Sequence, residues 1–144
     1  MDFFQLLSSV HAWAGLLLFL LALLSVSLSV MTAVRPAADR PNSTLVRKAN
    51  IVGIAESSVA GTLTLTGLIV MIMGPWKITE LWLWMSLMIM VFYSIALVRI
   101  TKRARLEVAG GGGSNIKAGM QVILQIGHVL LLIVAYFMML VKPA

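Results

Sequence analysis

Cysteine is absent from this 144-residue sequence, and acidic residues are scarce, since five Asp and Glu stand against eleven Lys and Arg. The missing thiols exclude disulfide bonds, thiolate nucleophiles and cysteine-ligated zinc or iron–sulfur sites. Only 11% of the residues are charged, whereas 60% are hydrophobic. A water-soluble fold cannot hide so much apolar surface, so the composition excludes an ordinary soluble domain.

The apolar residues are gathered in four long runs, at residues 3–34, 49–74, 81–100 and 117–141. A helix rises about 1.5 Å per residue and a bilayer core is about 30 Å thick, so each run can cross a membrane once. The first run lacks a basic leader and is much longer than the apolar core of a signal peptide, so we expect it to remain as a helix. We predict an all-α fold, with residues 1–144 forming one integral membrane domain: an antiparallel, up-down-up-down bundle of four transmembrane helices.

The basic residues predict how this bundle is oriented. Nine of the eleven fall in or beside the first and third connections, and they are Arg35, Arg40, Arg47, Lys48, Arg99, Lys102, Arg103, Arg105 and Lys117. Because cytoplasmic loops carry an excess of Lys and Arg, we expect these connections to be cytoplasmic and both termini to be non-cytoplasmic. A bacterial inner (plasma) membrane is the expected location. This placement leaves no soluble basic surface, which excludes nucleic acid as a partner. The third connection also contains Gly110–Gly113, which has the composition of a flexible linker.

Each predicted helix carries small and polar residues at alternating steps of three and four. In lipid, such a face turns toward protein, whereas the apolar residues turn outward. The four faces are Ser8, His11, Gly15, Leu18, Ala22, Ser25 and Ser29; Gly53, Glu56, Ala60, Leu63 and Gly67; Trp82, Ser86, Ile89, Tyr93 and Ala96; and Gln121, Gln125, His128, Leu132, Ala135 and Met139. We expect all four faces to point into the bundle.

Four polar residues of these faces fall at a similar depth. Ser29, Glu56, Tyr93 and Gln125 each lie six or eight residues from a basic residue of the cytoplasmic side, which corresponds to roughly 9–12 Å of helix. We predict that they form one polar layer in the cytoplasmic half of the membrane. Two interpretations stay open: a hydrogen-bonded cluster that fixes the register of the helices, with Glu56 protonated, or a relay for protons or cations.

The two histidines, His11 and His128, lie on the inward faces of the first and last helices. Counted from Asp2 and Lys117, both fall in the middle of the membrane, whereas counting back from Arg35 places His11 near the outer surface. Two imidazoles at the same depth on facing helices are candidate axial ligands of a b-type haem used in electron transfer. The alternative is that each histidine hydrogen-bonds across the bundle.

Methionines and small residues give two further hypotheses. Soft thioethers suit Cu(I), although methionine is also ordinary filler in apolar helices. The outer methionines are Met71, Met73, Met85, Met88, Met138 and Met139. Gly53, Ser57 and Gly61 form a small-xxx-small series that permits close approach within the chain, to a second copy or to a partner in a membrane complex. No complete catalytic motif is present, so a non-enzymatic transporter-like protein or accessory subunit is an open alternative to haem and copper.

Two segments resemble known families. His11–Leu16 reads HAWAGL and resembles the first helix of small bacterial four-helix membrane haem proteins, including HemJ-type protoporphyrinogen oxidases and copper resistance protein D relatives. Gly67–Ile69 with Gly74–Trp76 is similar to a cytochrome b-like group of four-helix proteins. The resemblance implies haem binding. Gly61 stands where the cytochrome-like group has a histidine, and the Arg- and Lys-containing signatures of the HemJ type are missing, so the oxidase activity is not carried over.

Overall fold

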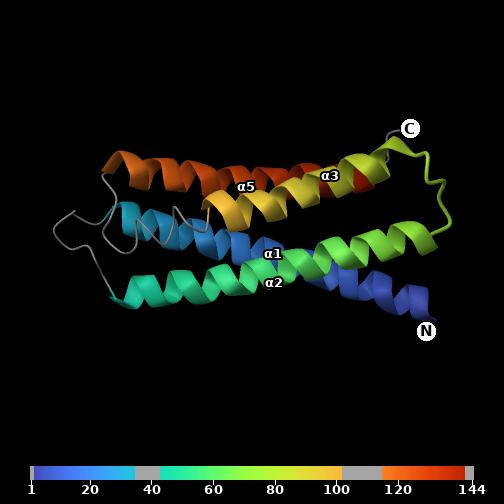
Figure 1. Cartoon of the computed structure of the whole chain (residues 1–144), viewed down its shortest axis with the longest axis horizontal. Helices are drawn as coiled ribbons and strands as arrows, with labels where there is room; N and C mark the ends of the chain where they lie inside the picture. Colours follow the sequence, from blue (N-terminus) through green and yellow to red (C-terminus); the bar gives the residue numbers. More distant parts are fainter. Residues whose placement is uncertain (1, 35–42, 102–114, 142–144) are drawn as a thin grey trace.

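The computed structural model describes residues 2–34, 43–101 and 115–141, and these form four α-helices and one short π-helical segment. The elements are α1 (Phe3–Ala33), α2 (Ser43–Met73), α3 (Leu81–Ala96), η2 (Leu97–Thr101) and α5 (Asn115–Val141). The start of α1, the connection between α2 and α3, and the end of α5 lie together at one end of the molecule (Figure 1). We call this the hairpin end. The predicted all-α, antiparallel four-helix bundle is confirmed.

All four α-helices are long and apolar enough to cross a membrane. Their candidate spans are Phe3–Met31, Arg47–Met73, Leu81–Arg99 and Gly119–Val141. The shortest has 19 residues, and at about 1.5 Å per residue it measures about 28 Å, close to the thickness of a hydrocarbon core of about 30 Å. The chain is therefore a small integral membrane protein.

Two helix boundaries differ from the sequence prediction. α2 begins at Ser43 rather than at residue 49, so Arg47 and Lys48 are exposed residues of the helix itself. The prediction followed the apolar run, but backbone hydrogen bonds continue a helix whether or not its side chains are apolar. The α-helical part of α3 ends at Ala96, and Leu97–Thr101 continues it as a π-helix. Such a turn is rare and leaves no periodic signal in the sequence.

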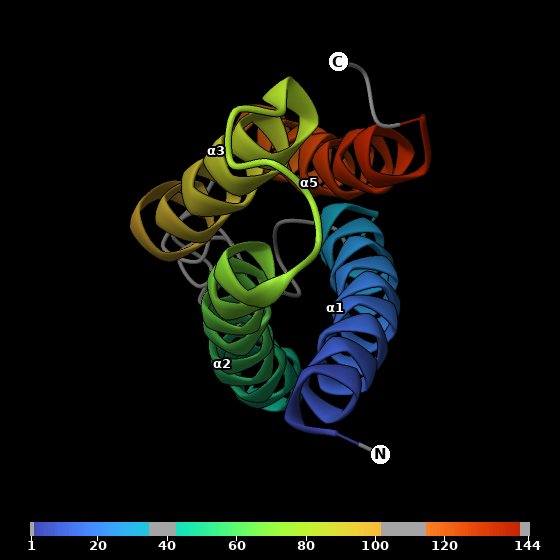
Figure 2. The ribbon, with the colours of Figure 1, turned by 90° about the vertical axis from the view of Figure 1, so that its right-hand side faces the viewer.

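The four helices form a ring around the bundle axis, as the view along the bundle shows (Figure 2). α1 packs against α2 and α5, and α3 packs against the same two helices from the other side. Each helix therefore has two antiparallel neighbours. This arrangement brings one face of every helix to the axis and leaves the opposite face on the outside.

Most residues that face the axis belong to the predicted inward faces, and Met90 and Leu97 are additions to them. The largest core cluster contains Leu18, Ala22, Ala60, Leu63, Met90, Tyr93, Leu97, Leu132 and Ala135. Ser25, Glu56, Gln121, Gln125 and His128 are buried as well. Large apolar side chains such as Trp13, Leu65 and Met88 are exposed on the outside, which is the expected arrangement for a surface that contacts lipid.

A tight connection at residues 74–80 closes the α2–α3 hairpin. A Cβ atom on Gly74 would overlap the indole of Trp76, so glycine leaves room for the Trp76 ring in this position. Trp76 Nε1 then donates a hydrogen bond of 3.0 Å to the carbonyl oxygen of Met71, the third-last residue of α2. The turn is further closed by a backbone hydrogen bond of 3.0 Å from Glu80 to Lys77.

The orientation of the bundle in the membrane stays a prediction. Among the described residues, Arg47, Lys48 and Arg99 belong to the end opposite the hairpin end, and Lys77 lies in the α2–α3 connection. Several residues used in the sequence argument lie outside the described part of the chain: Arg35, Arg40, Lys102, Arg103, Arg105, Lys142 and Gly110–Gly113.

Candidate functional site

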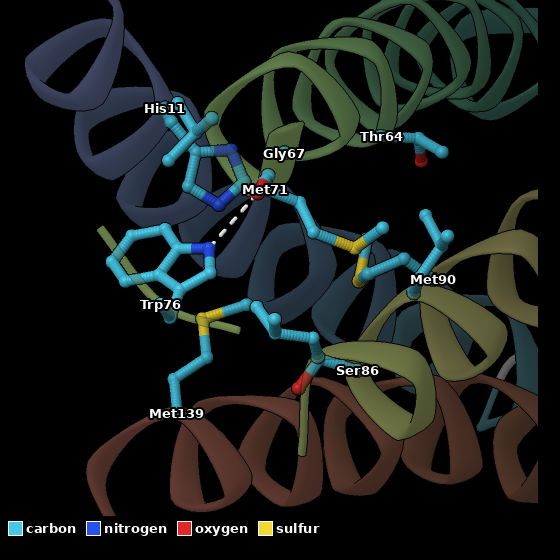
Figure 3. Close-up of a pocket in the computed structure, with 11 residues that line it drawn as sticks. His11, Thr64, Gly67, Met71, Trp76, Ser86, Met90 and Met139 are labelled. Atoms are coloured by element: carbon cyan, nitrogen blue, oxygen red, sulfur yellow. Dashed lines mark hydrogen bonds between the residues drawn. The ribbon is translucent and has the colours of Figure 1, made fainter. Parts of the chain in front are cut away.

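A cavity of about 70 Å³ opens inside the bundle near the hairpin end. All four α-helices and the α2–α3 connection contribute to its wall, and Figure 3 shows the side chains that line it. The groups with metal-binding or hydrogen-bonding atoms are His11 from α1, Thr64 and Met71 from α2, Ser86 and Met90 from α3, and Met139 from α5. Because no single helix supplies the set, the cavity exists only when the bundle is assembled.

His11 is held in a defined orientation against α2. Its Nδ1 lies 3.0 Å from Thr66 Oγ1. Thr66 Oγ1 also lies 2.8 Å from the carbonyl oxygen of Thr62 and 3.1 Å from that of Leu63. When the single hydroxyl hydrogen goes to one of these carbonyls, Thr66 Oγ1 accepts a hydrogen bond from His11 Nδ1. In that tautomer Nε2 keeps its lone pair, which is the form of histidine that binds a metal.

Gly67 makes room for the His11 ring. A Cβ atom at position 67 would come 2.9 Å from His11 Cε1, closer than Cβ atoms approach other heavy atoms in folded proteins. The imidazole thus packs directly on the backbone of α2. Gly67 was predicted to lie on the inward face of its helix, but not beside His11.

Three methionines line the cavity together with His11. Met71 and Met90 are buried, Met139 is half-buried, and Figure 3 shows the sulfur-bearing ends of Met71 and Met90 directed into the same space. Of the six outer methionines selected from the sequence, the cavity includes Met71 and Met139. Met73 and Met88 are exposed, and Met85 and Met138 are half-buried outside the cavity lining.

Met90 and Ser86 also belong to this site, although the sequence did not predict them there. They are one helical turn apart on α3, at the i, i+4 spacing that places two side chains on one face. Ser86 is only 5% exposed, and no hydrogen-bond partner for its hydroxyl occurs in the described part of the chain. Because Ser86 was already on the predicted inward face, its i, i+4 spacing to Met90 could have placed Met90 on that face too.

The tryptophans of the hairpin end divide into buried and exposed groups. Trp82 is buried and packs with Met71 and Leu83, and its ring meets that of Trp76 edge-on with the ring centres 5.6 Å apart. Its indole nitrogen donates a hydrogen bond to Glu80. Trp84 is 46% exposed, which is typical of an aromatic residue at a membrane interface. Trp76 and Trp82 therefore support the cavity from the hairpin side.

The four residues of the predicted polar layer, Ser29, Glu56, Tyr93 and Gln125, are all buried, with exposed fractions of 0–1%. Ser29 Oγ accepts a hydrogen bond of 2.6 Å from Gln121 Nε2. Tyr93 packs edge-on against His128, with the ring centres 4.8 Å apart. Ser29 therefore belongs to a pair with Gln121, whereas Tyr93 belongs to a pair with His128.

The structure does not bring His11 and His128 together. The Ser29–Gln121 hydrogen bond fixes the antiparallel register of α1 and α5, so His128, seven residues after Gln121, lies level with Ala22, seven residues before Ser29. Ala22 is eleven residues from His11 on α1, which is about 16 Å along a helix. Two axial nitrogens on one haem iron must meet within about 4 Å, because a metal–nitrogen bond is about 2 Å long. The observed register does not fit a haem held by this pair.

The third predicted set lies on α2. Gly53 is buried, Ser57 and Gly61 are half-buried, and a Cβ atom on Gly61 would meet no other group within 4 Å. Ser57 Oγ donates a hydrogen bond of 2.8 Å to the carbonyl oxygen of Gly53. Gly53 is thus packed inside the bundle, whereas the surface at Gly61 is open.

The fold and the cavity together define the class of the protein: a four-helix integral membrane bundle with a small internal cavity lined by one imidazole and three thioethers. No protein-family model matches the sequence, and no curated protein or solved structure matches it. The resemblance to four-helix membrane haem proteins therefore stays a prediction.

Proposed function

We propose that this protein binds a soft monovalent metal cation, of the Cu(I) class, inside the membrane at the hairpin end. One observation carries the proposal: His11, Met71, Met90 and Met139 line a single cavity, although they come from four different helices. Imidazole and thioether groups are the ligands that soft cations prefer among the groups available in a chain without cysteine.

The chemistry of the cavity wall favours a soft cation over a hard one. Neither Asp nor Glu is among the residues that line the cavity. Within the described residues there is also no group of three or more His, Asp or Glu side chains that could hold a metal ion. Hard divalent cations such as Mg²⁺ and Ca²⁺ require several charged or carbonyl oxygen ligands, whereas Cu(I) is bound by neutral sulfur and nitrogen.

The surroundings of His11 support the same proposal. A histidine that binds a metal usually donates its second ring N–H to a neighbouring acceptor, which fixes the ring and its tautomer. Here Thr66 Oγ1 lies within hydrogen-bond distance of the His11 ring, and the ring packs against the backbone of α2 at Gly67. The indole of Trp76 is also part of the cavity wall, where an aromatic face can stabilise a nearby cation.

The haem and electron-transfer hypothesis is the competing proposal, with the transporter-like or accessory-subunit role as a third. In the observed register, His11 and His128 are too far apart to bind the same haem iron. Haem binding by this chain would therefore need a different pair of ligands. The accessory role would use the open surface at Gly61, where close approach of another helix is sterically free.

The test is metal binding by the purified full-length protein in detergent. Ag(I) serves as the probe because it is a soft monovalent cation that does not change its oxidation state under the assay conditions. Isothermal titration calorimetry should show one Ag(I) ion bound per protein chain. Replacing Met71→Leu together with Met139→Leu conserves side-chain volume and should weaken binding more than about tenfold, as expected for the loss of metal ligands.

The matched control is Met73→Leu with Met88→Leu, which changes two exposed methionines of α2 and α3 outside the cavity lining and should leave Ag(I) affinity unchanged. Equal losses in both double variants, or no binding by the wild type, would overturn the proposal. An absorption spectrum of protein expressed with ample haem distinguishes the haem hypothesis from the metal-binding proposal, because bound b-type haem gives a strong Soret band.

A further inference from the structure

We propose that the bundle contains a proton-binding site in the membrane interior, centred on Glu56 and distinct from the cavity at the hairpin end. The site, which we call the Glu56 layer, consists of Ala22, Ser25, Glu56, Tyr93, Gln125 and His128. Its existence does not depend on metal binding in the cavity.

Helix register places these residues at one level. His128 is level with Ala22, as derived from the Ser29–Gln121 hydrogen bond. The His11–Thr66 hydrogen bond sets the register of the antiparallel helices α1 and α2. Ala22 lies eleven residues after His11, and Ala55 lies eleven residues before Thr66. Ala22 is therefore level with Ala55, the neighbour of Glu56. Tyr93 joins from α3 through its ring contact with His128. Every helix of the bundle thus contributes to the Glu56 layer.

The Glu56 layer is shielded from the surface. Glu56, Tyr93, Gln125 and Ser25 are 0% exposed, and His128 is 4% exposed. A charged carboxylate in such a place is costly unless a proton, a cation or strong hydrogen bonds compensate it. Among the described helices, the titratable groups at the level of Glu56 are Tyr93 on α3 and His128 on α5, while α1 contributes Ser25 and Ala22.

Gln125 provides an independent observation that the layer is built for a polar ligand. Its side chain is fully buried, and neither its amide oxygen nor its amide nitrogen has a hydrogen-bond partner among the described residues. Gln125 lies on α5 between Gln121, which bonds Ser29, and His128, which contacts Tyr93, so it faces the bundle interior. Buried amides are nearly always hydrogen-bonded, and exceptions mark ligands, water or catalytic groups.

Both polar and apolar residues adjoin the Glu56 layer along the bundle axis. Toward the hairpin end, Leu18, Leu63 and Leu132 lie between the layer and the cavity. Toward the opposite end lie the buried Ser29–Gln121 pair and the buried apolar residues Leu28, Val52 and Leu97. A hydronium ion that reaches the layer gives its proton to a carboxylate oxygen of Glu56 and leaves as water, and the reverse step releases the proton.

Infrared spectroscopy of the full-length protein in lipid vesicles tests this site directly. The wild type should show the C=O stretch of a carboxylic acid that is absent in Glu56→Gln, shifts in D₂O and disappears as the pH is raised. Asp2→Asn should leave this band unchanged, because Asp2 is exposed. Gln125→Leu should move the pH at which the band disappears, whereas Gln5→Leu, at an exposed glutamine near the start of α1, should not.

Each contrary result overturns the proposal. A Glu56 band that is insensitive to both pH and D₂O would identify a permanently neutral structural residue. The absence of a Glu56 carboxylic acid band at any pH would identify a carboxylate that never takes up a proton. Size-exclusion chromatography of all variants shows whether each retains the native assembly, and Ag(I) titration of Glu56→Gln shows separately whether the cavity still binds metal.

Discussion

The imidazole of His11 lies against the backbone of α2 at Gly67, so closely that a Cβ atom at position 67 would come 2.9 Å from His11 Cε1. The two residues are 56 positions apart in the chain, and the same imidazole is hydrogen-bonded to Thr66. A glycine in the second helix therefore determines where the histidine of the first helix can lie. This dependence leads to the first of four predictions.

Gly67→Ala should displace the His11 ring and weaken Ag(I) binding about 10–100-fold, the range for changes to groups that orient a metal ligand. Gly61→Ala is the matched control, because a Cβ atom there meets nothing within 4 Å. That control should keep wild-type affinity and gain about 0.5–1 kcal/mol of stability from higher helix propensity. Ag(I) titration measures the affinity, and reversible unfolding in mixed micelles measures the stability. Equal Ag(I) affinities in both variants would contradict the assigned role of His11.

Ser29→Ala should destabilise the bundle by about 0.6 kcal/mol, and by no more than about 1.7 kcal/mol, the range for hydrogen bonds between membrane helices. The substitution removes the acceptor for Gln121 Nε2, and both residues are buried. Ser27→Ala should change stability by less than about 0.5 kcal/mol, because Ser27 is exposed and its hydrogen bond within the described residues is to Leu23 of its own helix. Reversible unfolding in mixed micelles compares the two variants, and a larger loss for Ser27→Ala would refute the register argument.

The Tyr93–His128 ring contact should contribute a coupling energy of about 0.5–1.5 kcal/mol, as edge-on aromatic pairs do. A double-mutant cycle with Tyr93→Leu, His128→Leu and the combined variant isolates this contact from the other interactions of each residue. The observed ring-centre distance of 4.8 Å is the basis for the expectation. Strictly additive effects of the two single substitutions would mean that the rings do not interact in the membrane.

Cysteine labelling should place the hairpin end outside the cytoplasm. The natural chain contains no cysteine, so Thr79→Cys and Arg47→Cys each introduce a single thiol, at the hairpin end and at the opposite end respectively. A membrane-impermeant maleimide applied to intact cells should label position 79 and should reach position 47 only after the membrane is opened. The cysteine-free parent is the control, and the reverse labelling pattern would invert the predicted orientation.

Much of the architecture could be predicted from the sequence because membrane helices are constrained by length and polarity. Four apolar runs of sufficient length gave four helices, and the positions of residues such as Ala22, Glu56, Gln121 and Gln125 identified the faces that turn inward. The start of α2 at Ser43 and the π-helical segment after Ala96 could not be predicted, because backbone hydrogen bonding determines them without a hydrophobic signal.

The candidate site could be predicted only in part. His11, Met71 and Met139 were selected from the sequence, but in two separate hypotheses, one for haem and one for copper. The cavity combines them and adds Met90 and Ser86. The sequence indicates how far a residue lies from the end of its own helix, but it does not show how far neighbouring helices slide along each other.

The sequence by itself determined the number of spans, their lengths and the inward face of each, because each depends on periodicity and polarity within one segment. Only the tertiary structure decided which residues meet across helices. The Ser29–Gln121 and His11–Thr66 hydrogen bonds set a register in which His11 joins three methionines and His128 joins Tyr93, about 16 Å away along the axis. Register is a relation between helices: at about 1.5 Å per residue, a slide of one turn would give each histidine different neighbours.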